Sequence, residues 1–203
     1  MNEKRTSMVK ICLAVGLALS PALGFAQCTT TFSGEAVALK ANALGISLTL
    51  ADTGQLPSSG GNLSNSAASV NVAGIASANT LSSSTSGSGS SSQSQSTLLD
   101  LNLLNGLVTA SAVKSNSSAT CSGGLAAVSG NAQLVGLTVA GQSILVSNPN
   151  LSVSLPGGIS VIINQQTSSS GGTSGSMTVN ALHVTGPSID IVDASAHSDI
   201  TCP

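Results

Sequence analysis

Apolar and polar residues alternate with a period of two in much of the chain after residue 27, which is the pattern of β-strands. Residues 46–50 (ISLTL) and 151–155 (LSVSL) show it most clearly, with one face apolar and the other polar. The second run ends at Pro156-Gly157-Gly158, a strong turn signal. Helical spacing sustained over three turns is absent after residue 27. The pattern therefore predicts strands and no long helix in this part of the chain.

One hairpin is marked by its turn. Residues 99–103 place three leucines on one face, Asn105-Gly106 suits the positive φ angles of a tight turn, and 108–113 return as the partner strand. The remaining strand candidates are 31–41, 69–78, 125–138, 143–147, 159–166, 177–185 and 189–201. Many short strands separated by turn signals predict an all-β protein, an antiparallel β-sandwich or a partly closed barrel.

Two segments are low in complexity. Residues 82–96 are nearly all Ser, Gly, Thr and Gln, and 168–176 are a shorter version. Such composition is typical of flexible coil, so we expect both to be solvent-exposed loops inside one domain that spans 27–203. The alternative is a domain boundary at 82–96, which would leave a short N-terminal unit with a marginal core.

The first 26 residues have the layout of a secretory signal peptide, which would form a short helix. Lys4, Arg5 and Lys10 supply the positive end, residues 11–23 supply the apolar core, and small residues precede a cut after Ala26. The alternative, a lipoprotein signal with Cys28 lipidated, is disfavoured because Gln27 stands where a small residue is needed. We expect a cleaved, exported protein, secreted or at the cell surface, with no membrane span.

Few side chains that carry chemistry remain after residue 26. The chain from there contains one aromatic residue, Phe32, and two lysines against six acids, a net charge of −4. This composition excludes a basic nucleic-acid footprint and a polybasic membrane patch. It also argues against most enzymes and small-molecule sites, and we expect no cofactor. Small residues along the strands predict thin, closely packed layers without an aromatic core.

The stretch from His183 to Asp199 is the one place that resembles a site. Alternation would put Asp193, Ser195, His197 and Asp199 on one face of a strand, opposite Val192, Ala194, Ala196 and Ile200. Same-face neighbours on a strand lie roughly 6.6 Å apart, too far for a catalytic relay. His183 and His197 could meet across a hairpin and bind a metal, but two histidines are weak support for such a site. We interpret the stretch as a solvated polar face and assign no catalytic or metal residue.

Three cysteines remain after the signal peptide, namely Cys28, Cys121 and Cys202. An odd number in an oxidising compartment predicts one intramolecular bridge and one spare thiol. Spacing does not determine the pairing; we favour Cys121–Cys202, which would tie the last strand to the middle of the domain. Cys28 would then be a mobile terminal thiol or an intermolecular link between subunits.

The second half of the chain contains an ordered series of blocks at 107–114, 119–121, 134–142, 153–157, 161–166, 178–184 and 194–202. In this order the blocks resemble the choice-of-anchor P family of bacterial surface proteins. The resemblance implies an exported protein without an established enzymatic activity. It also implies that Cys121 and Cys202 belong to the framework of the domain and that Cys28 does not. The last matching block is followed only by Pro203, so we do not expect the C-terminal anchor that the resemblance implies.

These features favour a secreted, non-enzymatic structural protein, a self-associating subunit of a bacterial surface layer, extracellular matrix or filament. Its partners would be further copies or other surface proteins, and segment 29–41 is the candidate for a strand donated to a neighbouring copy. The first alternative is an adhesin-like module that binds another surface. The second is a metal-dependent enzyme centred on His183 and His197.

Overall fold

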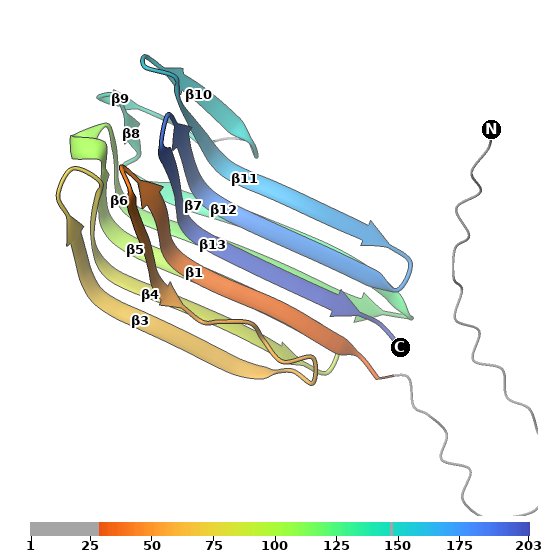
Figure 1. Cartoon of the computed structure of the whole chain (residues 1–203). Helices are drawn as coiled ribbons and strands as arrows, with labels where there is room; N and C mark the ends of the chain where they lie inside the picture. Colours follow the sequence, from red (N-terminus) through yellow and green to blue (C-terminus); the bar gives the residue numbers. More distant parts are fainter. Residues whose placement is uncertain (1–28, 147) are drawn as a thin grey trace, which may run out of the picture.

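The computed structural model describes residues 29–146 and 148–203, which form two antiparallel β-sheets packed face to face (Figure 1). The expected signal peptide, 1–26, and Cys28 lie outside the described residues. The two sheets do not close into a barrel, so the prediction of an antiparallel sandwich is confirmed and the barrel alternative is wrong. The described residues contain no helix of the length and apolarity that a membrane crossing requires.

The first sheet has six strands in the order β10-β11-β12-β13-β1-β2. Its strands are β1 (Thr31–Ala43), β2 (Ile46–Asp52), β10 (Leu151–Leu155), β11 (Ile159–Gly171), β12 (Ser174–Gly186) and β13 (Ile189–Thr201). The chain enters through β1 and returns at its end as β13, so the two pair along their whole length. Segment 29–41, expected as a donated strand, thus contributes β1 to its own sheet, where it pairs with β13 on one side and, from Val37 onward, with β2 on the other.

The second sheet has seven strands, with β3-β4-β5-β6-β8-β9 along its path and β7 paired beside β6. Its strands are β3 (Gly61–Val72), β4 (Ala76–Ser88), β5 (Ser91–Leu103), β6 (Val108–Ser122), β7 (Leu125–Val135), β8 (Thr138–Val139) and β9 (Gln142–Ser143). The predicted turn at Asn105-Gly106 is confirmed, since a short 3₁₀ segment (Leu104–Gly106) gives both residues positive φ. The sheets pack with β1 over β4, β13 over β5 and β6, and β12 over β7.

A crease crosses the strands at mid-length, where Figure 1 shows them bending together. On the six-stranded sheet, Ala51, Ala194 and Asn164 have φ of 48°, 48° and 52° at the same level of three alternate strands. On the seven-stranded sheet, Thr80 and Asp100 have φ of 48° and 51°. Non-glycine residues adopt this conformation at a cost of about 1–2 kcal/mol each. The packing on both sides of the crease must therefore offset the cost of these backbone conformations.

The interior changes character along the strands. On the side of the crease where β1 meets β2, large aliphatic side chains fill the core, among them Leu39, Leu103, Ile163, Leu182 and Ile191. On the other side, the residues between the sheets are mainly hydroxyls and small residues. The buried hydroxyl residues are Ser83, Thr85, Ser92, Ser94, Ser96, Ser115, Ser117 and Ser198. We call these two regions the aliphatic half and the hydroxyl half.

A small apolar cluster and a disulfide lie at the end of the hydroxyl half. Phe32, Leu56, Ala119 and Ile200 pack together there. Beside them Cys121, in β6, is bonded to Cys202, which follows β13, with the Cα atoms 5.6 Å apart. The favoured pairing is confirmed. The bridge joins the two sheets and closes a long loop of chain, which stabilises the fold by about 4 kcal/mol in the chain-entropy account.

The prediction of coil loops at 82–96 and 168–176 is wrong. Residues 82–88 and 91–96 lie in β4 and β5, and 168–171 and 174–176 lie in β11 and β12, with only tight turns between. Every second residue of 92–96 is buried, because its serines point between the sheets. Two strand candidates also have wrong bounds. Candidate 69–78 spans the turn from β3 to β4. Of candidate 143–147 only residue 143 lies in a strand, β9, while 144–146 lie outside any strand and 147 lies outside the described residues.

Candidate functional site: a charged sheet face and the open sheet edges

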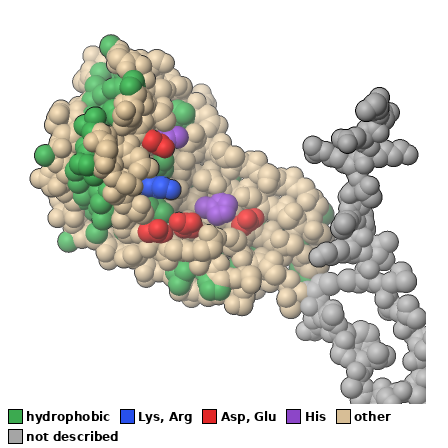
Figure 2. Space-filling view, viewed as in Figure 1, with side chains coloured by type: hydrophobic (Ala, Val, Ile, Leu, Met, Phe, Trp, Pro, Cys, Tyr) green, Lys and Arg blue, Asp and Glu red, His purple; other side chains and the backbone are tan. Residues whose placement is uncertain are grey.

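The charged side chains gather on the outer face of the six-stranded sheet, where Figure 2 shows them across the middle of the view. This face carries Glu35, Lys40, Asp52, His183, Asp190, His197 and Asp199. A groove of about 370 Å³ lies at the crease, with Glu35, Lys40, Asp52 and His197 among its walls. The predicted polar face at the end of the chain is therefore part of a larger surface built from β1, β2, β12 and β13.

His183 is held by two acceptors. Its Nδ1 lies 3.0 Å from Gln165 Oε1 and its Nε2 lies 2.9 Å from Asp190 Oδ1. The side-chain amide of Asn180 donates to the same Gln165 oxygen, and this bond fixes the orientation of the Gln165 side-chain amide. Both ring nitrogens therefore face acceptor oxygens. Neither nitrogen is directed at an open ligand position.

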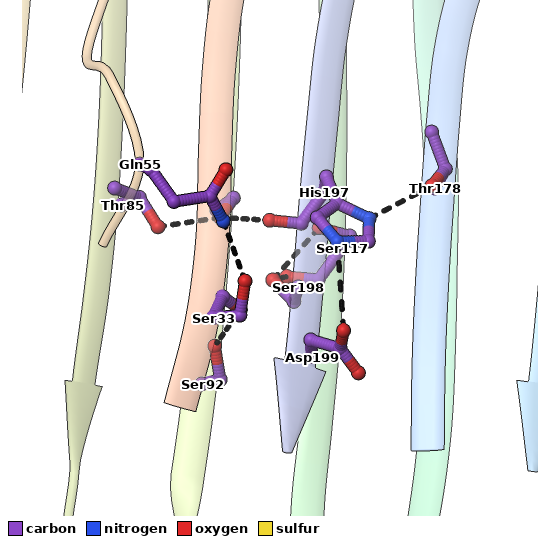
Figure 3. Close-up of polar contacts among 10 residues, drawn as sticks. Ser33, Gln55, Thr85, Ser92, Ser117, Thr178, His197, Ser198 and Asp199 are labelled. Carbon is purple, nitrogen blue, oxygen red and sulfur yellow. Dashed lines mark hydrogen bonds and ion pairs between the residues drawn. The ribbon is translucent and has the colours of Figure 1, made fainter. Parts of the chain in front are cut away.

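His197 lies on β13, on the other side of the crease from His183, and has different partners. Its Nδ1 is 2.9 Å from Thr178 Oγ1 on β12, and its Nε2 is 3.8 Å from Asp199 Oδ2 (Figure 3). Ser195, His197 and Asp199 share the outer face as expected. The two histidines are not brought together. Within 29–146 and 148–203, no group of three or more His, Cys, Asp or Glu side chains is placed to hold a metal ion.

Asp193 is not on this face. The positive φ of Ala194 shifts the alternation of β13 by one residue, so Asp193 and Ala194 are both buried. Asp193 sits at the aliphatic side of the crease, paired with Leu39 on β1 and Leu182 on β12. Neither carboxylate oxygen has a hydrogen-bond partner among the described residues. Burial raises the pKa of this carboxyl from 3.8 to about 8.

Hydroxyl groups join the two sheets in the hydroxyl half (Figure 3). Ser117 Oγ lies 2.8 Å from Ser198 Oγ, and Ser198 Oγ donates to the Ser117 carbonyl. Ser94 Oγ lies 2.7 Å from Thr85 Oγ1 and donates to the His197 carbonyl across the interface. Most of these buried hydroxyls are thus satisfied, as stability requires. The Ser115 hydroxyl is an exception among the described residues.

The sheets approach closely here because glycines stand where a side chain would meet the opposite sheet. A Cβ added at Gly34 would lie 2.5 Å from Thr85 Oγ1 and 3.2 Å from Ser94 Oγ. A Cβ added at Gly130 would lie 2.4 Å from Val179 Cγ2. The thin layers that the sequence predicts from its small residues are therefore found in this half.

The outer face of the seven-stranded sheet is polar but almost uncharged. Three rows of side chains run across β3 to β7 in the hydroxyl half, in register from strand to strand. The rows are Asn62-Ser86-Gln93-Ser118-Ser129, Ser64-Ser84-Gln95-Asn116-Asn131 and Ser66-Ser82-Thr97-Lys114-Gln133. Lys114 is the one charged member of the three rows.

The edges of the sheets differ in how they are protected. In the six-stranded sheet the edge strands are short, seven residues in β2 and five in β10. Where β11 extends beyond β10, the Gln166 N–H donates to Asn150 Oδ1. In the seven-stranded sheet, β7 is covered in part by the opposite sheet: the Ala126 N–H donates to the Gly172 carbonyl and the Ala132 N–H to Asn164 Oδ1.

The other edge of the seven-stranded sheet, β3, is open. It is 12 residues long and contains no proline and no charged residue. Most of its residues are exposed. Short length, charges and prolines are the usual protections of an edge strand. Of the long edges described here, β3 is the least protected.

Sequence reasoning missed two features of this surface. It assigned the serines of 82–96 to a loop, although the alternation of Gln93 and Gln95 with Ser92, Ser94 and Ser96 is a period-two signal. It also placed β3 only in part, since the candidate at 69–78 covered its end and the following turn.

Comparison with known proteins finds no family model, no curated protein and no solved structure that matches this chain.

Proposed function

We propose that this chain is a secreted, non-enzymatic structural protein, a self-associating subunit of a bacterial surface layer, extracellular matrix or filament. The observation that carries the proposal is the open edge of β3, 12 uncharged residues at the end of a seven-stranded sheet. An open edge offers a row of main-chain donors and acceptors to another strand. Soluble monomers commonly block such edges, so its presence favours a partner that pairs with it.

Two further properties support a structural role. Two of the chemistry-bearing side chains singled out by the sequence are engaged or buried: His183 contacts Asp190, and Asp193 lies in the core. The fold is also cross-linked between its sheets by Cys121–Cys202, which suits a protein exposed outside the cell. The resemblance of residues 107–202 to exported surface proteins and the signal-peptide pattern of 1–26 agree with that location.

The proposal is tested by the oligomeric state of the exported protein. Light scattering over a wide range of protein concentration, with electron microscopy of the same samples, should show species that grow with concentration. A monodisperse monomer at every concentration would overturn the proposal. A parallel series with reductant separates the two alternatives for Cys28, a mobile terminal thiol or an intermolecular link, since a bridge through that thiol would make part of the assembly sensitive to reduction.

An adhesin-like module is the second candidate, favoured by the groove at the crease that contains Glu35, Lys40 and Asp52. It predicts saturable binding to another surface that weakens when Lys40→Ala removes the cation of the groove. Self-association should be unchanged in that variant. Equal binding by the wild type and Lys40→Ala would contradict a role of this groove.

A further inference from the structure

We infer that β3 pairs with β3 of a second copy, antiparallel and about a two-fold axis at Ser64, so that two seven-stranded sheets join into one. The inference rests on the proposed function and names its interface. Two-fold contacts use the same patch on both copies, so the patch must be complementary to itself. An uncharged strand of Ser, Asn, Ala and small aliphatic residues meets this requirement without like-charge repulsion.

The direction of the main-chain groups on β3 fixes which residues can pair. The Ser66 N–H donates to the side-chain oxygen of its neighbour Asn65, at 2.8 Å, rather than to β4. Ladder bonds on one strand alternate between its two sides, so the main chain of Ser64 points away from β4 as that of Ser66 does. The cap on Ser66 is local and exposed, which makes it easy for an incoming strand to displace.

The straight part of β3 has Ser64 at its centre. It runs from Gly61 to Ala67. Ala67 is the last residue on this side of the crease that pairs with β4. Antiparallel pairing about Ser64 places Ser64 opposite Ser64 of the second copy, and Asn62 opposite its Ser66. Residues on the far side of the crease, up to Val72, would bend away from this axis.

The same register aligns the polar rows of the outer face. The three rows end on β3 at Asn62, Ser64 and Ser66. Pairing about Ser64 joins the Ser64 rows of the two copies and joins each Asn62 row to a Ser66 row. The result is a polar face that continues across ten strands, with Lys114 of each copy as its one charged member. The main-chain pairing along the β3 edge and the alignment of the polar rows therefore favour the same register, the one centred on Ser64.

The other long edges fit a second copy less well. On β7, the Ala126 and Ala132 N–H groups already donate to the opposite sheet, so a strand added there would displace both bonds. The edge strands β2 and β10 are short, and β2 ends in a charged residue, Asp52. This comparison favours β3 over a head-to-tail contact between β3 and β7.

Two substitutions in the full exported protein test the pairing. Ser64→Lys sets two like charges opposite each other at the axis, and Ser64→Pro removes the N–H that the second copy would use. Ser64 is exposed and its N–H points away from β4, so both variants should fold, as circular dichroism will verify. The matched control is Asn131→Lys, an equal charge change at an exposed position of the same row on β7.

We expect both Ser64 variants to raise the dissociation constant of the smallest assembly by about tenfold or more, and Asn131→Lys to leave it within about twofold. Nitroxide labels on Ser64→Cys in a Cys28→Ser background should show strong dipolar broadening, because directly opposite Cβ atoms lie about 5 Å apart. The same label at Asn131→Cys should show none.

The outcomes separate this inference from the proposed function. Assembly that survives both Ser64 variants overturns the β3 pairing and leaves self-association standing. Loss of assembly in Asn131→Lys as well as in Ser64→Lys contradicts the two-fold contact in favour of a head-to-tail contact through β7. A wild-type protein that is monomeric at all concentrations overturns both.

Discussion

The aliphatic half and the hydroxyl half belong to the same strands, yet they fill the space between the sheets in different ways. In the aliphatic half, side chains such as Leu39 and Leu182 occupy a wide gap and satisfy no polar group. In the hydroxyl half, serines such as Ser117 and Ser198 bond across a narrow gap that glycines make possible. The stability of the aliphatic half depends on the volume of the side chains that fill its core. The stability of the hydroxyl half depends on the close approach of the two sheets. The two halves should therefore fail under opposite kinds of substitution.

Asp193 should produce the largest effect, because it is an unpartnered carboxyl in the aliphatic half. Its folded pKa of about 8 lies above the unfolded value of 3.8, so the folded state binds more protons between these values. The contribution of this carboxyl to stability should be fully present below about pH 4 and be lost as pH rises toward 8, with a slope that approaches about 1.4 kcal/mol per pH unit. Urea unfolding at a series of pH values measures it.

The control is Asp193→Asn, which keeps the shape and removes the ionisation. Its unfolding free energy should be nearly flat over the same pH range apart from the contribution of other groups. A wild-type curve parallel to that of Asp193→Asn would show that this carboxyl is hydrated or paired in solution.

Truncation should damage the aliphatic half next most strongly. Leu182→Ala removes a fully buried side chain beside Ile163 in the aliphatic core, and should cost about 3 kcal/mol through lost burial and the cavity left behind. Leu99→Ala, at a side chain that is 38% exposed, should cost much less. Equal losses for the two variants in denaturant unfolding would contradict a packed aliphatic core.

Enlargement should damage the hydroxyl half instead. Gly34→Ala adds a Cβ that meets Thr85 Oγ1 and the His197 carbonyl, so the sheets must separate locally at a cost of about 2 kcal/mol. Gly171→Ala is the matched control, since nothing lies within 4 Å of its added Cβ. Equal melting temperatures for the two variants would show that the sheets are not in close contact at Gly34.

Removal of a complete hydroxyl pair should have the smallest effect. In the double variant Ser117→Ala and Ser198→Ala both partners of one bond are lost together, so the net change should be within about 1 kcal/mol. Ser117→Ala alone should cost more than its share, because it leaves the Ser198 hydroxyl with fewer partners. A double-mutant cycle measures the coupling, and strict additivity would contradict a shared bond.

The same comparison explains what the sequence could predict. Residues 189–201 form β13 as expected, because apolar residues such as Ile191 and Ile200 mark its inner face. The composition of residues 82–96 predicts coil because their inner face is mostly Ser, a polar residue, so no apolar stripe marks the side that is buried. The inner serines become core only because glycines on the opposite sheet bring acceptors within reach, which is a tertiary property.

Local geometry accounts for the other differences. Asp193 was expected outside because strict alternation assigns it there, and one residue with positive φ, Ala194, reverses the phase. The open edge of β3 depends on strand order, which no local pattern contains. The pairing of Cys121 with Cys202 was not readable from spacing, since it depends on two strand ends in different sheets that meet in space.

The most direct test of a chain folded as continuous strands through both halves is amide hydrogen exchange along β5, which contains both kinds of residue. We predict that the amides of Ser92, Ser94 and Ser96 exchange as slowly, within about tenfold, as those of Leu101 and Leu103, since β4 and β6 flank the whole strand. Exchange of the three serine amides at the rate of an unfolded chain, with protection confined to the leucines, would contradict the account.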